Sequence, residues 1–138
     1  MSAKISAPSR ELLSRSLPMV RQHKPALMGQ MAHSLGAEGT STRNSREIAG
    51  ALVELLFDQT HDLITGNERR GLDRLFDEHR AIGIESRHYS RFGDALVPAL
   101  TDLLGPNVPR EVPSAWCDAF WTIVRNGRAA VRRQKTHA

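Results

Sequence analysis

The sequence has a single cysteine, Cys117, and few aromatic residues, which make up 5% of the chain. One cysteine excludes an internal disulfide framework, so an apolar core must stabilise the fold. With 40% hydrophobic residues over 138 positions, one domain can form that core, mainly from aliphatic side chains. No run reaches the roughly 18 apolar residues of a membrane span, and the first residues lack the apolar run of a signal peptide. We therefore expect one cytoplasmic domain over residues 1–138, with no membrane partner.

An excess of one charge is also missing, since the net charge is only +4. Much of the positive charge falls in a basic tail at residues 125–138. Such a tail can contact nucleic acid, but no aromatic platform or known nucleic-acid motif accompanies it. A solvated helix end is the commoner explanation, because cations suit the negative pole of the helix dipole. We therefore do not expect a nucleic-acid partner.

Strand patterns are absent as well, because no period-two alternation and no Asn-Gly hairpin occurs. Helical spacing of apolar residues recurs instead and predicts an all-α domain of about six helices. Two prolines fall inside these helices: we expect Pro18 to bend or break the first helix and Pro98 to kink the fifth. We expect the first helix to start after Pro8 and the second to run from Pro25 to Gly36. The third should be capped by Asn44, with Glu47 completing a capping box, and should end near 65–67. The fourth should cover 72–79 and be stopped by Gly83, the fifth should run from Ser86 to Gly105, and the sixth should start between Pro109 and Pro113.

One of the six histidines continues an apolar helix face. Leu72, Leu75, Phe76 and His79 have the spacing i, i+3, i+4, i+7, which predicts that His79 is buried at the end of its helix. A core histidine that donates to a backbone carbonyl is the commoner explanation. The functional alternative is an axial haem ligand, with one ring nitrogen on iron and the other donating to an outer partner. Zinc is less suited, because no second ligand-type side chain stands at ligand spacing.

Residues 75–89, Leu-Phe-Asp-Glu-His-Arg-Ala-Ile-Gly-Ile-Glu-Ser-Arg-His-Tyr, resemble the proximal segment of bacterial globins, especially single-domain globins and the haem domains of flavohaemoglobins. In that family a histidine ends one helix, an apolar-Gly-apolar turn follows, and a pair such as His-Tyr opens the next helix. The resemblance continues in one register through 92–96, 103–105 and 115–120, and is weaker at 16–20 and 44–57. It implies a globin-like fold in which His79 binds the iron of haem b.

The resemblance also implies roles around the haem. Tyr89 takes the place of a proximal tyrosine that organises the ligand histidine, although a core tyrosine is an equal alternative. Phe92 and Leu96 would line or support the pocket. From their spacing alone, without the resemblance, they are simply core residues. The remaining pocket positions implied are Ala32, Ser45, Ala49 and Leu52, with Ser45, or within one turn Arg46 or Glu47, at the distal polar position.

The sequence departs from the family at three places. Met31 and Ala32 stand where the family has an aromatic pair, often Phe-Tyr, so the tyrosine that stabilises bound oxygen is missing, and the adjacent His33 should point away. The connection between the second and third helices is shorter and lacks the phenylalanine that wedges the haem ring. Residues 128–133 read Arg-Ala-Ala-Val-Arg-Arg where the family has an acid that polarises the proximal histidine.

Together these features predict a haem-binding globin that binds a diatomic gas (oxygen, nitric oxide or carbon monoxide) as a sensor or scavenger, with no catalytic residue assigned. Two alternatives stay open. One is a haem-free globin-fold module that acts through protein contacts. The other is a nitric oxide dioxygenase that takes electrons from a separate reductase. A reductase, a signalling protein or a second copy of the chain are the partners that these readings imply.

Overall fold

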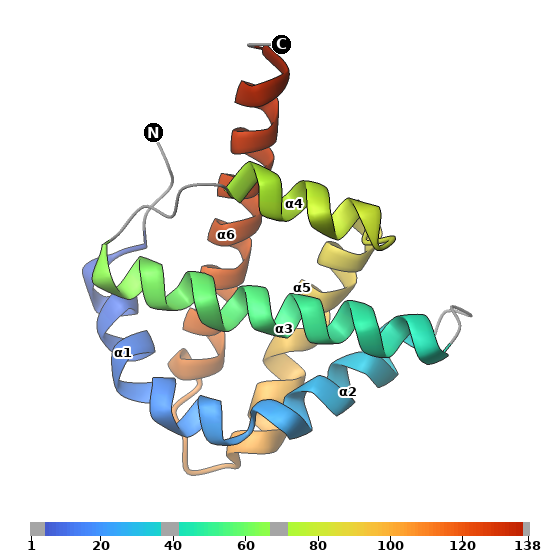
Figure 1. Cartoon of the computed structure of the whole chain (residues 1–138). Helices are drawn as coiled ribbons and strands as arrows, with labels where there is room; N and C mark the ends of the chain where they lie inside the picture. Colours follow the sequence, from blue (N-terminus) through green and yellow to red (C-terminus); the bar gives the residue numbers. More distant parts are fainter. Residues whose placement is uncertain (1–4, 37–41, 67–71, 137–138) are drawn as a thin grey trace.

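The computed structural model describes residues 5–36, 42–66 and 72–136, and within them every regular element is an α-helix. The helices are α1 (Ala7–Gln22), α2 (Lys24–Gly36), α3 (Thr42–Thr65), α4 (Leu72–Ala81), α5 (Ser86–Leu104) and α6 (Glu111–Thr136) (Figure 1). For these described residues, the expectation of an all-α, globin-like fold with about six helices is confirmed. No helix in the described part of the chain is long and apolar enough to cross a membrane.

The helices form one core rather than separate layers. α5 and α6 run antiparallel and pack against each other, and α3 crosses both (Figure 1). α2 packs on α3 and α5, while α4 packs on α6. The fully buried side chains come from five helices and are mostly aliphatic: Leu13, Leu27, Met31, Ile48, Leu52, Leu56, Phe92, Leu96, Leu100, Trp116, Phe120 and Ile123. This is the aliphatic core that the low aromatic content predicts.

Glycines set the ends of the helices around α5. The short turn between α4 and α5 contains Gly83 at φ 97°, a left-handed conformation that favours glycine. The N–H of Ile84 then donates to the carbonyl of His79 at 3.0 Å, which ties the turn back onto the last turn of α4. At the other end of α5, Gly105 has φ 84°. The predicted stops at both glycines are therefore confirmed, and the first one places the start of α5 beside His79.

A break at Pro18, one of the two predicted effects of this proline, is wrong, because α1 continues unbroken from Ala7 to Gln22. α5 likewise continues through Pro98. A proline leaves the carbonyl four residues earlier without its helical donor. Those carbonyls belong to Ser14 and Asp94, and all four residues are exposed, so water can replace the lost bond.

The predicted start of the third helix is also wrong. α3 begins at Thr42, so Asn44 lies inside the first turn rather than at an N-cap before it, and the predicted capping box with Glu47 loses its place. Ser45 is buried and faces the core together with residues one turn later, as it would with either start. The connection expected to be short, residues 37–41, lies outside the described residues.

Candidate functional site

The last turn of α4 presents His79 to the interior. Phe76 and His79 are the buried residues of this short helix, with 7% and 6% of their surface exposed, while Arg74, Glu78 and Arg80 are exposed. Buried residues three positions apart lie on one face of a helix, as the apolar spacing predicts. The prediction that His79 points inward is therefore confirmed at the level of burial.

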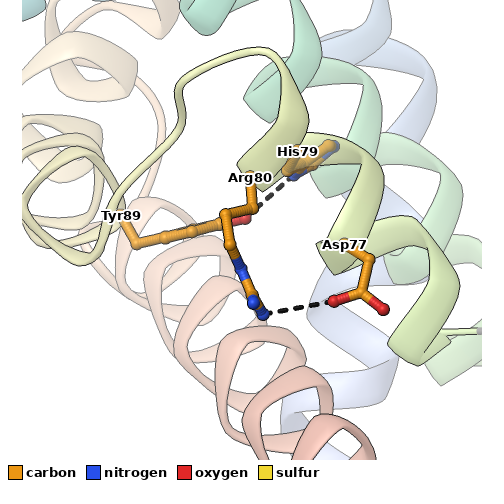
Figure 2. Close-up of polar contacts among 4 residues, drawn as sticks. All are labelled: Asp77, His79, Arg80 and Tyr89. Carbon is orange, nitrogen blue, oxygen red and sulfur yellow. Dashed lines mark hydrogen bonds and ion pairs between the residues drawn. The ribbon is translucent and has the colours of Figure 1, made fainter.

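His79 is paired with Tyr89 of α5. A buried hydrogen bond of 2.9 Å joins Nδ1 of His79 to the hydroxyl of Tyr89 (Figure 2). The ring of Phe76 stacks on Tyr89 with 5.3 Å between ring centroids and 16° between planes. The same Phe76 ring lies against the backbone of α6, where a Cβ added to Gly127 would lie 2.2 Å from it. Three helices thus fix the position of the Tyr89 ring and, through its hydroxyl, the imidazole.

Burial also sets the protonation state of this pair. It lowers the pKa of His79 below the ordinary value of 6.5, an effect that the charge of Glu78 partly opposes. Burial raises the pKa of Tyr89, against the smaller opposing effects of Arg128 and Arg80. The pair at neutral pH is therefore a neutral imidazole and a neutral phenol. Figure 2 shows Arg80 beside them, held by an exposed ion pair with Asp77 at 3.1 Å.

The second ring nitrogen of His79 is the atom left for a ligand. Nε2 makes no hydrogen bond with any residue in the described part of the chain. A neutral imidazole with Nδ1 bonded to an outer partner and Nε2 free is the arrangement of an axial haem ligand. The described residues contain no group of three or more His, Cys, Asp or Glu side chains that could hold a metal. Within the described residues, Nε2 of His79 is thus a single imidazole donor.

The expected pocket residues of α5 lie on the same side of that helix as Tyr89. Phe92 and Leu96 follow Tyr89 by about one and two turns, and both are fully buried. The ring of Phe92 packs on Phe120 of α6 with centroids 4.7 Å apart. These contacts make Phe92 a core residue whichever ligand the site takes.

The expected distal residues of α3 are buried too. Ser45, Ala49 and Leu52 are each at most 1% exposed. Ser45 lies against the end of α2, because a Cβ added to Gly36 would be 3.3 Å from its Oγ. The two other candidates for the distal polar position, Arg46 and Glu47, are exposed.

On α2 the exposure of the side chains rises from Met31 to His33. Met31 is fully buried, Ala32 is half-buried and packs at the edge of the core, and His33 is exposed. The expectation that His33 points away therefore agrees with its exposure. A hydrogen bond and ring contacts bring His79, Tyr89 and Phe76 together. Among the described residues, Ala32, Ala49 and Leu52 do not belong to this ring cluster.

Two features of the site were not predicted from the sequence. The first is the contact of Phe76 with Tyr89, because the sequence showed Phe76 only as a member of an apolar stripe. Its position three residues before His79, on the same helix face, was the available signal. His88 was seen only as part of a resemblance. Its Nδ1 accepts a hydrogen bond of 2.8 Å from the N–H of Glu85, the residue that caps α5. A histidine at the third helical position in place of the usual Glu or Gln was the available signal.

Comparison with known proteins finds a distant likeness to two flavohemoproteins. The chain is 24% identical over 147 residues to proteins named flavohemoprotein from two strains of Xylella fastidiosa, Temecula1 and 9a5c. The alignment covers 97% of this chain and 36% of each relative, so the chain spans about a third of their length. No family model and no solved structure matches. The likeness supports a distant globin relationship.

Proposed function

We propose that this chain binds one haem b, with His79 as the protein ligand of the iron, and through it a diatomic gas. The observation that carries the proposal is the buried His79–Tyr89 hydrogen bond, which occupies Nδ1 and leaves Nε2 without a protein partner. The distant flavohemoprotein likeness, which spans nearly the whole chain, supports the same proposal.

Each residue of the proximal side has a definite task in this proposal. With Nε2 on iron, the hydrogen of the neutral imidazole stands on Nδ1 and is donated to the oxygen of Tyr89. That bond fixes the tautomer and the plane of the ring. Phe76 holds the tyrosine ring by stacking. A haem held by His79 would supply an iron that binds oxygen, nitric oxide or carbon monoxide.

The distal surroundings that we propose are apolar. Ala32, Ala49 and Leu52 would face the gas, with Ser45 as the candidate polar group and Phe92 and Leu96 supporting the haem from α5. Loss of one hydrogen bond to polarised oxygen costs about 1.5–3 kcal/mol in a low-dielectric site. Such a pocket retains oxygen weakly and suits a sensor or scavenger, whose partner would be a signalling protein or a separate reductase.

A hemin titration tests the proposal. The full chain is titrated with hemin and the Soret band is recorded, for the wild type, for His79→Ala and for His33→Ala, which removes an exposed histidine. We expect saturation at one haem per chain for the wild type and for His33→Ala. His79→Ala should keep its helix content and lose the wild-type Soret band. A wild-type chain with no His79-dependent band would refute the proposal.

A haem-free globin-fold module is the second candidate, and one observation favours it. Met31, Leu52 and Leu96 are 0% exposed, so α2, α3 and α5 already close upon one another in the protein alone. A chain that folds cooperatively and shows no saturable hemin binding would be this module, acting through protein contacts.

A further inference from the structure

His88, in the first turn of α5, is a buried histidine that the proposed haem ligation does not use. It is 6% exposed, and its Nδ1 accepts the N–H of Glu85 at 2.8 Å. An acceptor nitrogen carries no hydrogen, so the hydrogen of the neutral ring stands on Nε2. That Nε2 is buried and has no hydrogen-bond partner. The tautomer of His88 is thus fixed by the backbone at the start of the helix.

The turn that His88 holds also carries Tyr89. The N–H groups of His88 and Tyr89 both donate to the carbonyl of Glu85, at 3.0 and 3.4 Å. Glu85 is therefore bound twice through its carbonyl and once through its N–H, and the direction of the Tyr89 side chain depends on this turn. The Tyr89 hydroxyl has to reach Nδ1 of His79 across the gap between two helices, so a shift of the turn moves it off its partner.

We propose that His88 is a positioning residue, which holds the first turn of α5 so that the Tyr89 hydroxyl meets His79 and which releases that contact when it is protonated. Any effect of this contact on a haem bound to His79 rests on the proposed function above. The positioning itself is a property of the protein alone.

Protonation breaks the arrangement for a geometric reason. A charged imidazole carries a hydrogen on both nitrogens, so Nδ1–H would face the N–H of Glu85 and Nε2–H would remain buried without an acceptor. Burial accordingly lowers the pKa of His88 below 6.5; Arg87 lowers it further and Glu85 opposes both. Arg87 and Glu85 belong to the same turn as His88. The titratable group of α4 nearest to this turn is His79, which is bonded to Tyr89. The contact is therefore kept at pH 6.5 and above, and it is lost as the pH falls through the lowered pKa of His88.

The chain has one tyrosine, so a tyrosine signal reports on Tyr89 alone. The haem-free full chain is labelled with ring-13C tyrosine, and its NMR signal is followed from about pH 7.5 to about pH 5. Two variants separate the roles of His88: His88→Gln keeps an acceptor at this capping position but does not titrate, and His88→Leu removes the acceptor. Circular dichroism checks that each variant keeps its helices.

We expect the wild-type signal to move as the pH falls. His88→Gln should start at the neutral-pH wild-type position and move less than the wild type as the pH falls, because only His79 then titrates beside Tyr89. His88→Leu should show the displaced position already at pH 7.5. A shift that persists in full in His88→Gln would assign the titration to another group, and a wild-type signal in folded His88→Leu would remove the positioning role. If His88→Leu does not fold, His88→Gln alone decides. These outcomes are independent of haem, so a failed hemin titration leaves them unaffected.

Discussion

The hydroxyl of Tyr89 lies 2.9 Å from Nδ1 of His79, and the two residues come from different helices that a glycine turn brings together. A hydrogen bond to the outer nitrogen orients an imidazole and makes it a stronger donor to a metal. In this chain the same tyrosine ring is stacked on Phe76, which in turn rests on α6. The orientation of His79 is thus coupled to the packing of three helices.

Tyr89→Phe removes the hydroxyl and keeps the ring stack. We expect the haem-free chain to lose about 1–3 kcal/mol of unfolding free energy, because a buried imidazole nitrogen is left without its partner. Hemin should still bind, with a more positive reduction potential, since His79 becomes a weaker donor. Urea unfolding and potentiometric titration measure the two effects. An unchanged potential would show that the hydroxyl does not tune the site.

Gly127→Ala tests the packing of Phe76 on α6. The added Cβ would lie 2.2 Å from the Phe76 ring, so the ring must move, and we expect a cost of about 1–3 kcal/mol in unfolding free energy. Gly29→Ala is the matched control, because its Cβ meets nothing within 4 Å on an exposed helix position. That change should stabilise the chain by about 0.5–1 kcal/mol. Equal effects of both substitutions on urea unfolding would contradict the close contact.

Ala32→Tyr should supply the oxygen donor that the distal side lacks. In the haem-loaded ferrous chain we expect oxygen dissociation to slow by about tenfold or more, because a hydrogen bond worth about 1.5–3 kcal/mol is gained. His33→Tyr places the same side chain at the next, exposed position and should leave the rate unchanged. Stopped-flow displacement of oxygen by carbon monoxide gives both rates. An equal response of the two variants would mean that Ala32 does not face the gas.

The haem-free chain should lose stability in acid. The pKa values of His79 and His88 both lie below 6.5 in the folded chain, so the unfolded chain binds more protons as the pH falls below that value. Stability is therefore complete above pH 6.5 and declines below it. Urea midpoints between about pH 7.5 and about pH 5 measure the decline, which should be shallower in His88→Gln. An equal slope in this variant would show that His88 does not contribute.

The sequence predicts the helices well, because the fold is determined by long apolar stripes and by glycines at the stops. The interior position of His79 followed from the spacing of α4, and the end of α5 followed from Gly105. The start of α3 was misplaced, since the helix begins at Thr42, before the apparent cap at Asn44. Pro18 did not break α1. The carbonyl of Ser14, which loses its helical donor to the proline, is on an exposed residue where water can bind it, and this exposure cannot be seen in the sequence alone.

The site was predictable only in part. The resemblance placed Tyr89 beside His79, and the hydrogen bond between them agrees with that placement. The packing of Phe76 on both Tyr89 and Gly127 was not predictable, because Gly127 of α6 lies far from the other two residues in the sequence. The reciprocal hold of His88 on Glu85 was missed because histidine is an unusual acceptor in a capping box.

The most direct test of the account replaces the His79 side chain by a free ligand. His79→Gly is loaded with hemin, reduced under carbon monoxide so that the gas occupies one iron position, and its absorption spectrum is recorded with and without added imidazole. The account predicts that the variant loses the wild-type spectrum and that imidazole restores it in a saturable way, while the wild type does not respond. A His79→Gly chain whose spectrum equals that of the wild type before imidazole is added would contradict the assignment of His79 as the haem ligand.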